Sequence, residues 1–209
     1  TVYYAKNTFV AKGGVHILTS SDGTSWTHAS STSYPLPDNN DGFIYGNNIF
    51  VRINDYFIES SSDGTSWTWR AGQASTRPYL AFTSLTFGNS IFVATGNLGD
   101  ILTSSDGISW TTRASGTHGY NLISVLYGNG TFVAFGVNYD TWRDDIILTS
   151  SDGISWSKQL GARGSYFFLG NNFFILGDDG SIFTSSDGTS WKSWTTGTLE
   201  TLNGVAYPE

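Results

Sequence analysis

One heptapeptide recurs five times along the chain, and this repeat constrains the fold more than any other feature. It reads Ser-Ser-Asp-Gly, then Thr or Ile, then Ser-Trp, and we call it the box. The box tryptophans are Trp26, Trp67, Trp110, Trp156 and Trp191. Successive ones lie 41, 43, 46 and 35 residues apart. This spacing predicts five structural units of one kind in a single domain over residues 1–209.

The fourth unit shows what one repeat contains. An apolar run at 122–127 precedes Gly128-Asn129-Gly130, and a second apolar run follows at 131–136. Asn-Gly between two such runs is a strong hairpin signal. A third run at 146–149 enters the box, and a last, half-polar strand begins near Trp156. Four strands in a repeat of about 40 to 50 residues are typical of a propeller blade. The sequence thus predicts an all-β, five-bladed β-propeller of four-stranded antiparallel blades.

Composition excludes several other classes of protein. Ten Lys and Arg against 17 Asp and Glu give a net charge of −7, so the chain lacks the basic surface that nucleic acid requires. The absence of Cys excludes disulfides and zinc–cysteine sites. Apolar runs such as Phe173–Leu176 are far shorter than the roughly 20 residues that span a bilayer. We expect no nucleic-acid partner, no membrane insertion and no cofactor.

Both termini contain a candidate first strand. Val2–Tyr4 matches the first strand of a unit, and Val205–Tyr207 matches it as well. Because a ring should leave no sheet edge open, we expect Val205–Tyr207 to pair beside the Phe9 strand. The C-terminal strand would then close the ring and displace or share the place of Val2–Tyr4. The alternative is a segment of a longer repeat array.

The boxes resemble the repeat of Asp-box (BNR-like) β-propellers, in which an Asp-Gly turn is followed by an aromatic residue. In this chain Gly follows Asp directly, whereas the common Asp box places one residue between them. More narrowly, GNGTFVA, ILTSSDG and SWT are similar to repeats of bacterial surface and phage tail-fibre-type proteins. The resemblance implies an extracellular or virion-surface location, with the chain forming part of a larger fibre or surface protein.

The box carboxylates are interpreted as structural turn residues. Each Asp can accept backbone N–H bonds within its turn, while the following Gly takes a positive φ. A calcium site is the functional alternative, but each box supplies one carboxylate where this ion takes several oxygens. The five residues are Asp22, Asp63, Asp106, Asp152 and Asp187.

The candidate ligand-binding residues lie on one predicted face. Alternating strands place the short hairpin turns and the boxes on one face, and the long, variable loops on the other. Because scaffolds hold binding residues in variable loops, we expect the ligand there. The residues selected are Tyr34, Tyr56, Tyr79, His118, Tyr120, Tyr139, Trp142, Arg143 and Trp194.

Aromatic rings beside Asn, Asp and Arg suit sugars, which present an apolar face and a rim of hydroxyls. The alternative is that the rings cover the blade ends. The insertion at 137–145, which contains Tyr139, Trp142 and Arg143, is the best individual candidate. The leading hypothesis is a non-catalytic, lectin-like propeller that binds a cell-surface glycan.

Two other functions remain open. The same face could serve protein interaction or assembly without a sugar. A sialidase-like glycosidase would need paired carboxylates, for which Asp140 with Asp144, or Asp178 with Asp179, are available. The three His residues fall in separate units without metal-ligand spacing, so no metal site is expected.

Overall fold

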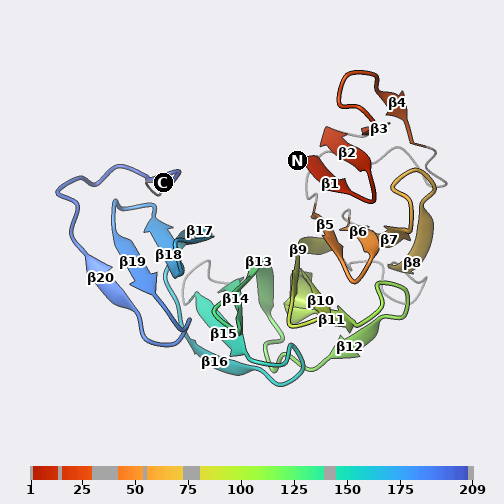
Figure 1. Ribbon diagram of the computed structural model, residues 1–209. Helices are drawn as coiled ribbons and strands as arrows, with labels where there is room; N and C mark the ends of the chain where they lie inside the picture. The colour runs from red at the N-terminus through yellow and green to blue at the C-terminus, as the bar shows by residue number, and fades with distance from the viewer. Residues whose placement is uncertain are drawn as a thin grey trace.

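The computed structural model contains five four-stranded antiparallel sheets arranged as consecutive blades along an arc (Figure 1). It describes residues 2–13, 16–29, 42–53, 56–72, 81–138 and 145–206. In every sheet the strands lie side by side in chain order. The prediction of an all-β fold with five four-stranded blades is confirmed.

The blades follow the chain from the N-terminus. Blade 1 contains β1 (Val2–Ala5), β2 (Thr8–Gly13), β3 (His16–Ser20) and β4 (Thr27–His28). Blade 2 contains β5 (Phe43–Gly46), β6 (Ile49–Ile53), β7 (Phe57–Ser61) and β8 (Thr68–Gly72). Blade 3 contains β9 (Phe82–Gly88), β10 (Ile91–Gly96), the 3-10 turn η1 (Asn97–Gly99), β11 (Ile101–Ser104) and β12 (Thr111–Arg113). Blade 4 contains β13 (Tyr120–Gly128), β14 (Thr131–Asn138), β15 (Ile146–Ser150) and β16 (Ser157–Leu160). Blade 5 contains β17 (Gly164–Leu169), β18 (Asn172–Gly177), β19 (Ile182–Ser185) and β20 (Lys192–Trp194).

Burial changes from the inside of each blade to the outside. The first strands line the concave side of the arc and the fourth strands form its outer rim (Figure 1). All five residues of β6 are buried, whereas all three residues of β20 are exposed. A second strand that is apolar on both faces needs a neighbouring blade on each side. The blades therefore stabilise one another as nearest neighbours, as in other repeat proteins.

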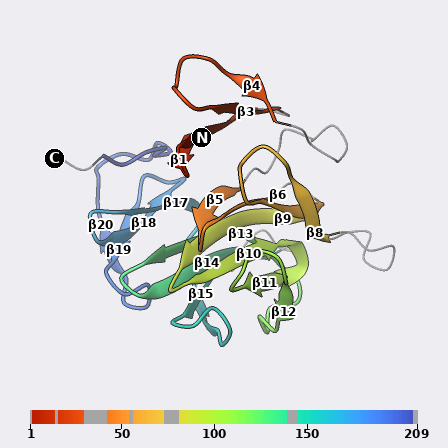
Figure 2. The same ribbon diagram turned by 45° about the vertical axis from the view of Figure 1, so that its right-hand side comes forward.

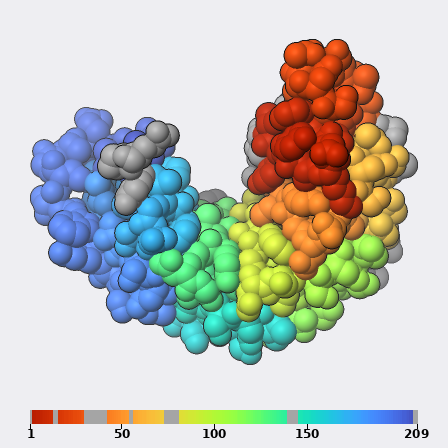
Figure 3. Space-filling view, viewed as in Figure 1, coloured from red at the N-terminus to blue at the C-terminus, as the bar shows by residue number. Residues whose placement is uncertain are grey.

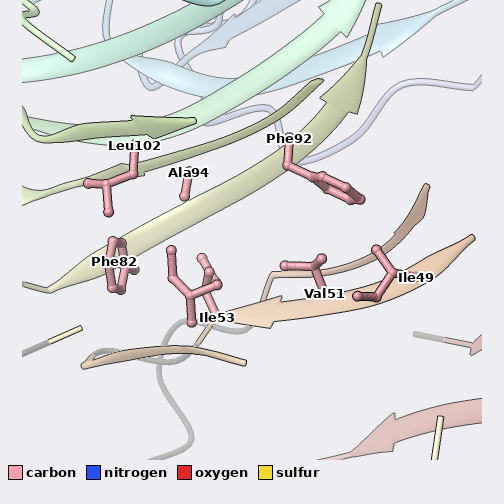
Figure 4. Packing of buried hydrophobic residues seen from close by; sticks show 8 residues of the cluster. Ile49, Val51, Ile53, Phe82, Phe92, Ala94 and Leu102 are labelled. Carbon is pink, nitrogen blue, oxygen red and sulfur yellow. The ribbon is translucent and has the colours of Figure 1, made fainter. Parts of the chain in front are cut away.

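The hydrophobic core lies between the blades. In the cluster of Figure 4, Ile49, Val51 and Ile53 from β6 face Phe92 and Ala94 from β10. Comparable clusters lie between blades 1 and 2, between blades 3 and 4, and between blades 4 and 5. Figure 2, turned by 45° from Figure 1, shows the sheets stacked in this way along the arc.

A glycine at the end of the first strand sets the distance between blades. A Cβ atom added to Gly128 would lie 2.1 Å from a ring carbon of Phe168 in the next blade. The same aromatic-on-glycine contact joins Gly88 to Tyr127. Any side chain at the glycine would push the ring, and with it the next blade, outward. Glycine is therefore required here for close approach.

The predicted closure of the ring is not seen. The N-terminal strand β1 pairs with β2, with Tyr4 opposite Phe9, and so completes blade 1. It occupies the edge that we expected Val205–Tyr207 to take. Residues 205 and 206 belong to no strand, and Tyr207 lies outside the described residues. Figures 1 and 3 show blades 1 and 5 well separated across the open side of the arc.

Blade 2 contains a buried ion pair where blade 3 has apolar residues. The Arg52 Nε donates to Glu59 Oε2 over 2.7 Å, and both side chains are almost fully buried. The guanidinium also lies 4.7 Å from the centre of the Trp67 ring. Burial lowers the pKa of Arg52, and the Glu59 charge opposes that shift. The equivalent cross-strand pair in blade 3 is Ala94 and Leu102.

The glycine contact predicts a specific loss of stability. We expect Gly128→Ala to lower the free energy of unfolding by about 1–3 kcal/mol, because its Cβ overlaps the Phe168 ring. Urea unfolding followed by Trp fluorescence measures the change. Gly204→Ala is the control, since nothing lies within 4 Å of that position. Equal stability of the two variants would contradict the spacing role of Gly128.

The buried ion pair predicts strong coupling between its two residues. Glu59→Leu should cost about 3–5 kcal/mol, because it leaves the Arg52 charge buried without its carboxylate. The double variant Arg52→Ala/Glu59→Leu copies Ala94 and Leu102 of blade 3 and should recover most of that loss. A double-mutant cycle of urea midpoints measures the coupling. Additive effects of the two substitutions would contradict it.

Candidate functional site

The five boxes form one repeated turn. In the fourth box Asp152 Oδ1 accepts the backbone N–H groups of Ile154 and Ser155, at 2.8 and 2.9 Å. Ser150 Oγ accepts the N–H of Gly153 and donates to the same carboxylate oxygen. The following glycine has a φ of 72°, which only Gly adopts without strain. These bonds agree with the structural interpretation of the box aspartates.

Hydrogen bonding within the turns lowers the pKa values of the box carboxylates. Backbone N–H bonds from Ser155 and Ile154 lower the pKa of Asp152. At Asp63, burial acts to raise the pKa, but the backbone donors Ser66 and Thr65 outweigh it and leave the pKa at about 2. The carboxylates are therefore ionised at neutral pH, and they accept hydrogen bonds from the backbone of their own turns.

The boxes also join neighbouring blades. The side-chain amide of Asn129, in the β13–β14 turn, donates 2.8 Å bonds to the carbonyls of Asn171 and Ser186 in blade 5. Asn47 makes the equivalent bonds from blade 2 to Ser90 and Ser105 of blade 3. The short turns and boxes on this face thus supply hydrogen bonds between blades. A ligand site is better placed at the opposite edge, where the variable loops lie.

Five of the nine sequence-predicted binding residues lie outside the described residues. They are Tyr34, Tyr79, Tyr139, Trp142 and Arg143. The insertion that we ranked first thus stays a prediction.

The other four predicted residues are not brought together. Tyr56, exposed on blade 2, lies near Phe57. His118 is exposed in the link between β12 and β13. Tyr120 is half-buried and packs against the core cluster of blades 3 and 4, so it covers a blade end. Trp194 lies on the outer strand of blade 5.

Trp194 is the described candidate with the most complete surroundings. Its side chain is 47% exposed, and its Nε1 donates to Thr184 Oγ1 over 2.9 Å. The Lys192 ammonium lies 3.8 Å from the ring centre. The ring borders an open hollow of about 270 Å³, which we call the Trp194 hollow. Its lining consists of Asp179, Gly180, Ser181, Ser193, Trp194, Thr195, Thr196, Thr198 and Leu199.

Hydrogen bonds hold the wall of the Trp194 hollow. Thr196 Oγ1 donates to the Gly180 carbonyl over 2.7 Å and ties the segment after β20 to the β18–β19 turn. Thr201 Oγ1 donates to the Asp178 carbonyl of the same turn. Asp179 Oδ1 accepts the N–H of Ser181. The hollow thus joins two segments of blade 5 that are fixed to each other.

Two further hollows adjoin the first. One, of about 290 Å³, shares Asp179 and Ser181 with it and adds Arg163. The other, of about 270 Å³, is mostly apolar and lies between blades 4 and 5, where the exposed Leu160 forms one wall. Each is smaller than the roughly 300–1,000 Å³ of pockets that enclose drug-sized ligands. The edge therefore suits a ligand bound along a surface.

Sequence reasoning selected Trp194 but not the residues around it. Asp178 and Asp179 were considered only as a catalytic pair. The pairing of Ile182 with Trp194 places the turn before β19 beside the segment after β20. That adjacency, which follows from antiparallel strand order, is the signal that could have grouped Asp179 with Thr196.

The surroundings of Asp179 bear on the glycosidase hypothesis. Hydrogen bonds from the Ser181 side chain and backbone lower the pKa of Asp179. A general acid in glycoside hydrolysis needs a raised pKa, so this carboxylate is poorly suited to donate a proton. Among the described residues, no group of three or more His, Asp or Glu side chains is placed to hold a metal ion. Within the same ranges, no helix has the length and apolar content to cross a membrane.

Comparison with known proteins supports the fold. No protein-family model and no curated protein matches the sequence. Among solved structures, YCF48 bound to a D1 peptide is similar, with a TM-score of 0.57 and 19% identity over 92% of this chain. The computationally designed Ika8 protein gives 0.64 and 15% over 95% of this chain, and a streptogramin B lyase gives 0.64 and 9% over 94%.

These similarities define the class of protein as a β-propeller. At such low identity they show the fold alone. The chain spans 65% of the YCF48 chain, 62% of the Ika8 chain and 68% of the lyase chain.

The box carboxylates predict an acid-sensitive fold. Their folded-state pKa values lie below the unfolded value of about 3.9, so the stabilisation is present above about pH 4 and is lost as the pH falls toward about 2. We expect the urea midpoint to decrease over that window. Asp63→Asn should lower stability at pH 7 and weaken the acid response; the control is Glu200→Gln, the same kind of acid-to-amide change at an exposed site outside the boxes. An unchanged pH profile in Asp63→Asn would contradict this account.

Proposed function

We propose that this propeller is a non-catalytic binding module that takes carbohydrate at the Trp194 hollow. The exposed indole of Trp194, beside a wall of hydroxyl groups and one carboxylate, is the observation that carries the proposal. The resemblance to bacterial surface and phage tail-fibre-type repeats supplies the setting. The chain then acts as a receptor-binding or adhesive part of a larger protein on an extracellular or virion surface, and its partner is a cell-surface glycan.

The chemistry of the hollow supports a sugar. A pyranose ring presents an apolar C–H face that stacks on an indole, and its hydroxyls both donate and accept hydrogen bonds. The side chains of Ser181, Ser193 and Thr198 offer hydroxyl partners, and Asp179 offers a charged acceptor. An open hollow of this size contacts a short saccharide along one side, which agrees with modest affinity per site.

Lys192 affects how a sugar would approach. Its ammonium occupies one face of the Trp194 ring, at 3.8 Å from the centre. Lys192 is exposed, and a lysine ammonium on its flexible stem is a mobile donor. A bound sugar therefore stacks on the other part of the ring or displaces the ammonium, which then donates to a sugar hydroxyl.

A protein segment is the second candidate ligand. The apolar hollow between blades 4 and 5 contains Phe183 and Trp191, and beside it Leu160 is 82% exposed. An apolar side chain of a partner would bury this surface. YCF48, one of the similar structures, was solved with a bound peptide. This observation favours protein interaction as the alternative function of the same edge.

The carbohydrate proposal predicts loss of glycan binding on removal of one ring. On a glycan array, Trp194→Ala should abolish the signal, because the stacking surface is lost. Trp69→Ala is the matched control, since Trp69 is a comparably exposed tryptophan on the outer strand of blade 2. Asp179→Asn should weaken binding less than the loss of the ring, because the amide keeps one acceptor.

Three outcomes would contradict the proposal. Glycan binding that survives Trp194→Ala would move the site elsewhere. The absence of any glycan signal, together with stable capture of a peptide at the apolar hollow between blades 4 and 5, would favour the second candidate. Turnover of a fluorogenic sialoside would show that the protein is an enzyme.

A further inference from the structure

Three contacts recur at the interfaces between consecutive blades, and each runs from one blade to the next. The first is the aromatic ring that packs on the glycine of the preceding blade, as Phe168 does on Gly128. The second is a valine of the second strand that packs on the next box glycine. A Cβ on Gly188 would lie 2.4 Å from Val133, for example. The third is the turn side chain that donates to the next box carbonyl, as from Asn129 to Ser186.

These contacts are regular along the arc. In all four interfaces a valine packs on the box glycine of the next blade. These residues are Val10, Val51, Val93 and Val133. The turn donor to the second serine of the next box is Lys6, Asn47, Asn89 and Asn129. The glycine is Gly46, Gly88 and Gly128, and blade 1 has Ala5 in its place.

Blade 5 departs from the pattern at all three places. Leu169, paired with Asn172, stands where Gly128 stands in blade 4. Phe174 stands where the other blades have valine. The turn begins with Gly170, which has no side chain to donate. Blade 1 accommodates the methyl group of Ala5 at this place, whereas the larger side chain of Leu169 fills the space that an incoming ring needs and blocks a further blade of this repeat.

Blade 1 keeps the complementary groups on its outward face. Tyr4, equivalent to Phe168, is 58% exposed. Phe9 is half-buried, whereas its equivalents in the other blades are fully buried. Trp26 is 37% exposed and lies 6.3 Å from the Phe9 ring, while the box tryptophan of blade 2 is 2% exposed. Gly23 retains the positive φ of a box glycine.

We propose that the outward face of blade 1, formed by Tyr4, Phe9, Gly23 and Trp26, is a docking site for a further blade of this same repeat. The occupant presents glycine at the end of its first strand, valine in its second strand and asparagine in its turn. Tyr4 packs on that glycine, and the valine packs on Gly23. The outward face of blade 5 lacks this pattern, so blade 5 of an unmodified second copy does not fit the blade 1 face.

The same repeat supplies a probe for this site. Leu169→Gly, Gly170→Asn and Phe174→Val convert the outward face of blade 5 to the pattern of the inner blades. Every replacement has a precedent in the chain, including the Asn47–Asn48 turn of blade 2. A fourth substitution, Tyr4→Ala, prevents the probe from docking onto copies of itself.

Sedimentation velocity of the probe mixed with the wild-type chain tests the proposal. We expect a 1:1 complex, no self-association of either protein alone, and binding roughly tenfold weaker or absent when the wild-type partner is replaced by Tyr4→Ala. Circular dichroism verifies that the probe is folded. If the full graft does not fold, Leu169→Gly with Tyr4→Ala removes the main block alone and should still give a weaker complex.

Other outcomes would overturn the proposal. A folded probe that forms no complex shows that the blade 1 face does not accept a blade. A complex that Tyr4→Ala leaves unchanged places the contact elsewhere. Self-association of the wild-type chain that requires both Tyr4 and Leu169 shows that Leu169 does not block the blade 5 face. Glycan binding at Trp194 is independent of each result.

Discussion

The packing of one aromatic ring on the glycine of the preceding blade is the contact on which the arc from blade 2 to blade 5 depends. Strands such as β6 are buried on both faces, so a blade without neighbours leaves apolar surface in water. The absence of a side chain at Gly128 lets the next sheet approach closely enough to cover that surface. The stability of the arc is therefore the sum of contributions from the interfaces between consecutive blades. Among the described residues, the outward faces of blades 1 and 5 lack such an interface.

The boxes supply the polar part of the same interfaces. The carboxylate of each box satisfies N–H groups of its own turn, and the box carbonyl accepts a bond from the preceding blade, as Ser186 does from Asn129. Backbone N–H and C=O groups that are shielded from water need such hydrogen-bond partners. The strict repetition of the box thus reflects a structural demand that every blade shares, and the groups free to differ lie at the opposite edge.

The sequence predicted what depends on local pattern. The period, the four strands of each blade and the burial of the second strand follow from residues close together in the chain. Ring closure was not predictable in this way, because Val2–Tyr4 and Val205–Tyr207 have the same local pattern, and only the pairing of Tyr4 with Phe9 distinguishes them. Similarly, the sequence selects Trp194 as a candidate binding residue, whereas its proximity to Asp179 depends on the pairing of Ile182 with Trp194.

The two proposed surfaces lie at opposite ends of the arc and use different faces of the repeat. The Trp194 hollow is at the variable edge of blade 5, and the docking face belongs to blade 1. A blade added at Tyr4 therefore covers no residue of the hollow, so assembly and ligand binding need not compete. The hollow depends on residues of blade 5 that the other blades do not repeat, so within the described residues this site belongs to blade 5 alone. Strong attachment to a glycan-covered surface would then come from several copies held together in a larger protein, where avidity multiplies a modest affinity per site.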